Sequence, residues 1–280
     1  MNVEMYNKLE KEAISRLPNR IIEASQSITF DRLGYPSRVS STKELWKYAD
    51  AMQEQRTRTN YDMLYGLTNR EFELVTKVTE KTRQITKEHC DREVIPASSV
   101  LRAVLAYRAV EVLGKQSVLE IGPGSGYLGA MLIADGYDYH SVENSQGFHL
   151  WQSLLFGEKY QIYWWDYITK EPPKVDLYVA NHVLNEMHPM ALKYTLSKAS
   201  DLFVIENFGG EIISTTNNTK SLIQSYGYSE AGYGAATLMY KGELPKYSAG
   251  LMVSNRWDDL LKLWGGSIPE TEDEKFWSSI

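Results

Sequence analysis

The 280-residue sequence has a single cysteine, Cys90, which excludes an internal disulfide and suits a reducing compartment. No apolar run approaches the roughly 18 residues of a membrane-spanning helix. The first residues also lack the basic and apolar regions of a signal peptide. The histidines and Cys90 do not have metal-ligand spacing, so no metal is expected. These absences predict a cytoplasmic protein with neither a membrane segment nor a metal site.

An excess of basic residues is also missing, since the formal net charge is −6. A protein that binds the phosphate backbone of nucleic acid needs a basic surface. We therefore expect a small molecule, and not nucleic acid, as the partner. The seven tryptophans and nineteen tyrosines could line a pocket for an organic ligand, although core packing explains most of them.

The most informative stretch, residues 118–126, places an acid and three alternating glycines between an apolar strand and an apolar helix. Glycines let the backbone pass close to a bound ligand. A dinucleotide-binding turn would need a third glycine where Tyr127 stands, and no Gly-Lys-Ser/Thr completes a P-loop. Glu120 would repel a phosphate and suits a cationic group instead. The turn predicts a nucleotide-like ligand other than a dinucleotide.

Polar residues follow the next strands at matching positions. A strand over 138–142 ends in Glu143, about twenty residues after the turn, where a ribose-binding acid belongs in such folds. A third strand over 160–164 leads to Asp166, and a fourth over 175–180 leads to Asn181. We expect these residues to meet at the carboxyl ends of parallel strands.

Residues 118–126 resemble motif I of the class I S-adenosylmethionine-dependent methyltransferases, and the order of turn, acids and polar loop matches that family over roughly residues 98–210. The resemblance implies an α/β fold, a Rossmann-like, doubly wound sheet of seven strands that binds S-adenosylmethionine. It implies that Glu120 faces the methionine end of the cofactor and that Asp166 accepts from the adenine amino group. The cofactor-binding residues that we predict are Glu120, Gly122, Gly124, Gly126, Glu143, Asn144, Asp166, Tyr167 and Asn181.

The loop after the fourth strand holds the candidate catalytic residues. An oxygen nucleophile of high pKa needs a general base, and residues 181–189 contain two of the five histidines and a glutamate. His188 precedes Pro189, so the positive end of a helix dipole would keep it neutral. Glu186 is either the base or the group that orients a histidine. His182 is either a base or only a wall of the cofactor pocket.

The identity of the methyl acceptor stays open in the sequence. Short motifs around residues 143–146 and 181–187 are similar to a group of sugar O-methyltransferases, which implies a hydroxyl acceptor on a sugar or other small polar metabolite. The Asn-Pro-Pro-Tyr loop of base-modifying methyltransferases is missing after the fourth strand. The alternatives are an N-methyltransferase, which needs no strong base, and a methyltransferase-like protein that binds without catalysis. A nicotinamide oxidoreductase is disfavoured by Tyr127.

The chain divides into a helical region, residues 1–96, and a cofactor-binding domain, residues 97–280. We expect the helical region to cover the substrate or to join two subunits in a homodimer, with a plain helical extension as the alternative. Ser41 with Glu44, and Thr68 with Glu71, form the spacing of capping boxes. Further predictions are a helix capped by Ser98 or Ser99, a helix begun by Pro189, a helix over 219–226, and closing strands near 236–241 and 249–254.

Overall fold

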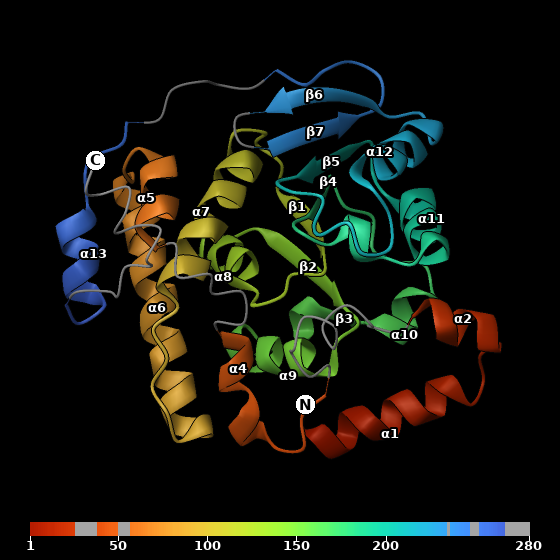
Figure 1. The fold of residues 1–280 in the computed structure, drawn as a ribbon, viewed down its shortest axis with the longest axis horizontal. Helices are drawn as coiled ribbons and strands as arrows, with labels where there is room; N and C mark the ends of the chain where they lie inside the picture. The colour runs from red at the N-terminus through yellow and green to blue at the C-terminus, as the bar shows by residue number, and fades with distance from the viewer. Residues whose placement is uncertain (26–37, 50–56, 234–235, 247–251, 267–280) are drawn as a thin grey trace.

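The computed structural model describes residues 1–25, 38–49, 57–233, 236–246 and 252–266. Its centre is a seven-stranded sheet in the order β3-β2-β1-β4-β5-β7-β6, in which β1 to β5 run parallel (Figure 1). β7 pairs antiparallel with β5, and β6 antiparallel with β7. The strands are β1 (Ser117–Ile121), β2 (Asp138–Glu143), β3 (Gln161–Tyr163), β4 (Leu177–Ala180), β5 (Leu202–Ile205), β6 (Ser229–Tyr233) and β7 (Ala236–Tyr240).

Helices cover both faces of this sheet, as predicted for a doubly wound fold. Alternate strand residues point to opposite faces, so Val179 joins the core beneath α7, α8 and α9 while Tyr178 joins the core beneath α10, α11 and α12 (Figure 1). The helices of this part are α7 (Ala97–Glu111), α8 (Tyr127–Ala134), α9 (Gln146–Leu155), α10 (Trp164–Tyr167), α11 (Pro189–Lys198), α12 (Thr216–Ser225) and α13 (Trp257–Leu263).

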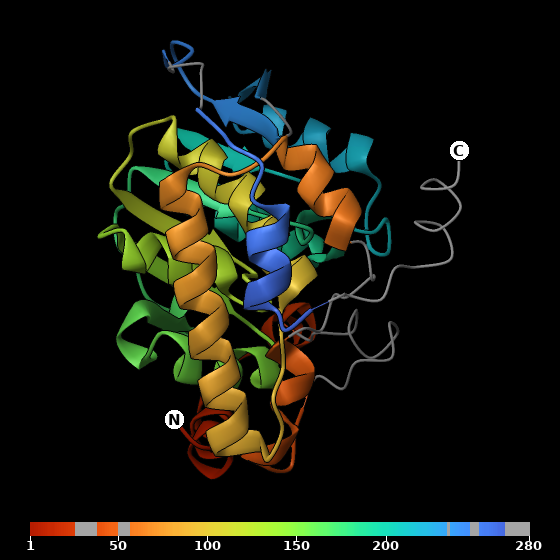
Figure 2. The same ribbon diagram turned by 90° about the vertical axis from the view of Figure 1, so that its left-hand side faces the viewer.

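The N-terminal region is helical, as expected, and shares its core with one face of the sheet. Leu74 and Val78 belong to the same buried cluster as Val118 of β1. The helices are α1 (Val3–Ile14), α2 (Asn19–Ala24), α4 (Trp46–Ala49), α5 (Thr57–Leu64) and α6 (Asn69–Cys90). Figure 2 shows α6 running beside α13, where Arg83 donates to the Leu263 carbonyl at 3.4 Å. None of the helices in the described ranges is long and apolar enough to cross a membrane.

The predicted capping box at the start of α6 is confirmed. The Thr68 hydroxyl accepts from the Glu71 backbone at 3.1 Å, and the Glu71 carboxylate accepts from the Thr68 backbone at 2.7 Å. The same carboxylate is buried and accepts a hydrogen bond from Nη2 of Arg108 on α7 at 2.8 Å. One glutamate therefore caps α6 and attaches it to α7, the helix that precedes the glycine turn.

Other local predictions were wrong or only partly confirmed. Ser41 caps a 3₁₀ turn (Thr42–Glu44), which is followed by the short α4. The Glu44 carboxylate accepts from the Ser40 amide at 2.7 Å and does not complete a capping box. α7 begins after Pro96, which leaves Ser98 and Ser99 inside the helix and not at its cap. The helix predicted over 219–226 is α12, which begins three residues earlier.

The closing strands are also placed differently from the prediction. The strand near 236–241 is confirmed as β7, but its partner is β6 and not the segment 249–254. In that segment, Ser254 makes only an isolated bridge with Leu67, and residues 249–251 lie outside the described ranges.

Candidate active site

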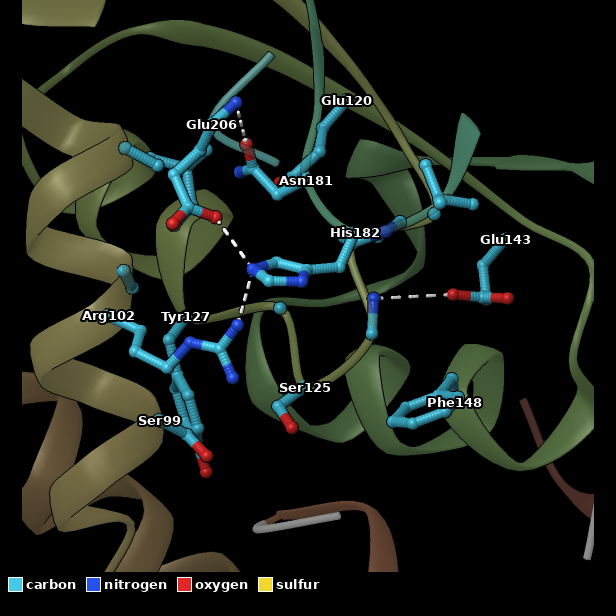
Figure 3. A pocket seen from close by; sticks show the side chains of 18 of the residues that line it. Ser99, Arg102, Glu120, Ser125, Tyr127, Glu143, Phe148, Asn181, His182 and Glu206 are labelled. Carbon is cyan, nitrogen blue, oxygen red and sulfur yellow. Dashed lines mark hydrogen bonds and ion pairs between the residues drawn. The ribbon is translucent and has the colours of Figure 1, made fainter. Parts of the chain in front are cut away.

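A pocket opens at the carboxyl ends of the central parallel strands, between α7 and the turn that follows β1 (Figure 3). Its empty space, open mouth included, is about 940 Å³. Residues after β1, β2, β4 and β5 line it, together with α7 and α9. Ligands of doubly wound folds bind at this edge of the sheet.

The glycine turn forms the floor of the pocket. Gly122, Gly124 and Gly126 have φ angles of 64°, 56° and 74°, a left-handed conformation that favours glycine. A Cβ on Gly122 would lie 2.7 Å from Val183 Cγ2, whereas a Cβ on Gly124 would meet nothing closer than 4.0 Å. The Gly124 amide donates to the Glu143 carboxylate at 3.3 Å, so the turn and the end of β2 are joined across the pocket (Figure 3).

Two buried carboxyl groups, Glu120 and Glu143, line the pocket. They are 2% and 3% exposed, respectively. Burial raises the pKa of each to about 7, and the charge of Glu143 adds to the effect on Glu120. Tyr139 donates to Glu120 at 2.6 Å and the Ser145 amide donates to Glu143 at 2.9 Å. Neither carboxyl pairs with a cation among the described residues. A ligand with a cationic group or with hydroxyl groups could therefore supply a positive charge or hydrogen-bond donors to these acids.

His182 projects into the pocket from the loop after β4 (Figure 3). Its φ is +57°, an uncommon conformation for a residue with a side chain. The loop is held by the His182 amide, which donates to the Asn207 carbonyl at 2.7 Å. His182 Nε2 lies 2.8 Å from Glu206 Oε2 and also contacts the Arg102 guanidinium (Figure 3). Backbone strain of this kind persists where surrounding contacts fix the residue, often at functional sites.

Glu186 and Asn185 come from the 3₁₀ turn Leu184–Glu186 on the same loop. Burial raises the pKa of Glu186 above its ordinary value, although the Gly210 amide donates to the carboxylate at 3.3 Å. Asn185 is buried beneath the loop, where its amide donates to the Gly209 carbonyl at 3.1 Å and to the Thr216 hydroxyl at 3.0 Å. Asn185 thus positions the loop that carries the candidate bases.

Nine predicted site residues line this pocket together. They are Glu120, Gly122, Gly124, Gly126, Glu143, Asn144, Asn181, His182 and Glu186. Three others lie outside the lining. His188 is exposed and its Nδ1 accepts from the Met190 amide at 3.2 Å, capping α11. Asp166 pairs with Lys170 at 2.9 Å, and Tyr167 is buried with its ring centroid 5.6 Å from that of Tyr194.

The pocket also holds charged residues that the sequence reasoning did not single out. Glu206 follows the fifth strand, and the rule that selected Glu143 and Asn181 would have selected it. Arg102 stands among apolar residues on α7, five residues after the helix begins at Ala97. A charged residue flanked by Leu101 and Ala103 is the signal that would have found it.

The topology decides the fold. Five parallel strands in the order 3-2-1-4-5 are extended by an antiparallel β7, and the ligand pocket lies over the first glycine turn. This is the class I methyltransferase fold. The predicted seven-stranded, doubly wound methyltransferase sheet with an N-terminal helical region is confirmed.

No protein-family model and no curated protein matches the sequence. The chain is similar to the solved structure of human N-acetylserotonin methyltransferase in complex with S-adenosylmethionine, at 12% identity over 83% of this chain and 65% of that chain, with a TM-score of 0.35. It is similar to the 16S rRNA methylase RmtB at 14% identity over 67% and 80%, TM-score 0.36. It is also similar to the cyclase SpnF at 14% identity over 57% and 72%, TM-score 0.38. The exclusion of nucleic acid as the substrate remains a prediction from the sequence.

Proposed function

We propose that this methyltransferase-fold chain transfers a methyl group from S-adenosylmethionine to a hydroxyl oxygen of a small molecule, with His182 as the general base. One observation carries the proposal. The His182–Glu206 pair, with Nε2 and Oε2 2.8 Å apart, faces the same pocket as the glycine turn and the two buried acids. A base oriented by a carboxylate beside a cofactor site is the arrangement that proton removal from a hydroxyl requires.

The described residues fit the cofactor on chemical grounds. Glu120 would pair with the ammonium group at the methionine end, and Glu143 would accept hydrogen bonds from the ribose hydroxyls. A cationic or hydroxyl partner offsets the burial that raises the pKa of both acids to about 7. Gly124, with free space above it, would let the backbone approach the ligand. When bound, S-adenosylmethionine would supply a methyl carbon on a positively charged sulfur. On transfer of the methyl group, the sulfur keeps the electron pair of the broken carbon–sulfur bond.

The base acts on the acceptor side of the pocket. A neutral imidazole of His182 takes the proton of the acceptor hydroxyl and becomes an imidazolium, which the Glu206 carboxylate stabilises as a charge-assisted pair. Asn181 fixes this partner, because its side-chain oxygen accepts from the Glu206 amide at 3.2 Å. Glu186 is the second candidate base, since burial raises its pKa toward neutrality. The exposed His188 is less suited, because it caps α11 outside the pocket lining.

Transfer of a labelled methyl group tests this proposal. Tritiated S-adenosylmethionine is incubated with the protein and, separately, with a small-molecule extract or with total RNA. We expect label in the small-molecule fraction only, on oxygen, with turnover reduced by His182→Gln and by Glu206→Gln. The matched control is His140→Gln, a histidine outside the pocket lining. Label in RNA would overturn the small-molecule acceptor, and label on nitrogen that survives His182→Gln would favour the N-methyltransferase alternative.

Three further properties remain predictions from the sequence: the cytoplasmic location, the homodimer and the substrate-covering role of residues 1–96. The structure places α4 near the pocket, because Tyr48 packs edge-on against Phe148, a lining residue, with ring centroids 5.0 Å apart. This contact supports a covering role for part of the helical region.

A further inference from the structure

One ring nitrogen of His182 faces two partners of opposite charge. Nε2 lies 2.8 Å from Glu206 Oε2 and also contacts the Nη2 atom of Arg102 (Figure 3). Arg102 comes from α7, Glu206 follows β5, and His182 follows β4, so three separate elements meet at one atom. Glu186, on the turn just after His182, is also close to this histidine. A charge on His182 lowers the pKa of the Glu186 carboxyl.

The two contacts cannot both be hydrogen bonds at the same time. A guanidinium only donates and a carboxylate only accepts, while a neutral imidazole carries one proton. With the proton on Nδ1, Nε2 accepts from Arg102 and Glu206 receives nothing. With the proton on Nε2, the ring donates to Glu206, and Nδ1 keeps the lone pair that a base needs.

Arg102 has donor capacity beyond this contact. A guanidinium carries five N–H groups, and no carboxylate of the described residues lies within ion-pair distance of it. Arg102 is the one permanent cation among the described lining residues, which include four glutamates. An anionic ligand in the pocket would therefore bind at Arg102, and a planar carboxylate fits its paired donors best.

We propose that Arg102 is a carboxylate receptor that positions the proton of His182. In this proposal, which rests on the proposed function, a ligand carboxylate draws Arg102 away from Nε2. The ring then loses the Nδ1 proton to water and gains one at Nε2, with its charge unchanged, and donates to Glu206. The base on Nδ1 exists only when the carboxylate is in place. The carboxylate belongs either to the methionine end of the cofactor or to the acceptor.

Nitrogen NMR of histidine-labelled protein tests this proposal at alkaline pH, where imidazole rings are neutral. His182→Gln assigns the signals. We expect the Nδ1–H form in the free protein and the Nε2–H form in Arg102→Met, with Arg16→Met, an exposed arginine on the loop after α1, as the unaffected control. The same form in wild type and Arg102→Met would overturn the proposal, because a merely structural Arg102 would not select the tautomer.

Ligands then separate the two sources of the carboxylate. S-adenosylhomocysteine, its decarboxylated analogue that keeps the amine, and acetate added to the analogue complex are each titrated into wild type. Conversion to the Nε2–H form by S-adenosylhomocysteine alone assigns the carboxylate to the cofactor, and conversion only with acetate assigns it to the acceptor. No conversion by any probe would overturn the switch.

Calorimetry distinguishes failure of this inference from failure of the proposed function. We expect Arg102→Met to weaken binding of the carboxylate-bearing probe by roughly tenfold to a hundredfold, the usual range for a charge-assisted hydrogen bond, and to leave the decarboxylated analogue nearly unchanged. Equal weakening of both nucleosides would count against a receptor role. If neither nucleoside binds wild type, the proposed function fails, while the comparison of free wild type with free Arg102→Met still decides whether Arg102 selects the tautomer.

Discussion

Replacement of the buried Glu120 by glutamine should stabilise the protein and weaken cofactor binding. Glu120 is 2% exposed, and burial raises the pKa of its carboxyl from the ordinary 4.5 to about 7. The folded state therefore holds a proton that the unfolded state has released, so stability decreases as the pH rises through this window. Each pKa unit corresponds to about 1.4 kcal/mol, so the ionised group costs the fold about 3 kcal/mol above neutral pH.

The glutamine variant removes this cost and keeps the local shape. Its side-chain oxygen can still accept from Tyr139, which donates to Glu120 at 2.6 Å. Urea unfolding of wild type and Glu120→Gln, measured from about pH 4 to about pH 8.5, should give equal free energies at the acid end and a difference of about 3 kcal/mol at the alkaline end.

Binding distinguishes this effect from a general gain in stability. The same variant should bind S-adenosylmethionine more weakly, because a neutral amide does not pair with an ammonium group. The control is Glu80→Gln, an exposed glutamate on α6, which should change neither quantity. A stability difference that does not vary with pH, or a destabilised Glu120→Gln at alkaline pH, would refute the reasoning.

Three further outcomes follow from the geometry. His182→Gln should lower kcat by roughly a hundredfold to ten-thousandfold, the usual contribution of a general base, with little change in S-adenosylhomocysteine affinity; unchanged kcat would remove His182 from the chemistry. In urea unfolding, Gly122→Ala should destabilise the protein more than Gly136→Ala. Both glycines have a positive φ, but only at Gly122 would a Cβ lie against Val183, so equal losses of unfolding free energy would contradict this crowding. Thr68→Ala should cost about 1 kcal/mol of unfolding free energy without affecting activity, since the capping box lies outside the pocket lining.

Much of the site was predictable because its residues obey one topological rule. Parallel strands end at the same edge of the sheet, so polar residues after successive strands meet there. Glu120 and Glu143 come together with Asn181 and His182 for this reason. Glu206 follows the same rule after β5, and applying the rule to every strand would have included it.

Some predicted site residues lie outside the pocket because of local structure that the order of strands and polar residues does not encode. β3 stops at Tyr163 and α10 begins at once, so Asp166 lies within a helical turn and pairs with Lys170. The same local effect acts on His188, whose role as a helix cap leaves it exposed. Arg102 enters the pocket because α7 packs beside the glycine turn, a long-range placement that a single sequence does not determine.

We propose that the pocket binds S-adenosylmethionine through the glycine turn and Glu143. The most direct test is calorimetric titration of the wild type with S-adenosylmethionine, S-adenosylhomocysteine and NAD, repeated on Glu143→Ala with Glu80→Ala as the matched control. The account predicts micromolar binding of both sulfur ligands, no binding of NAD, and loss of binding in Glu143→Ala alone. Binding of NAD in place of the sulfur ligands, or binding that survives Glu143→Ala unchanged, would contradict it.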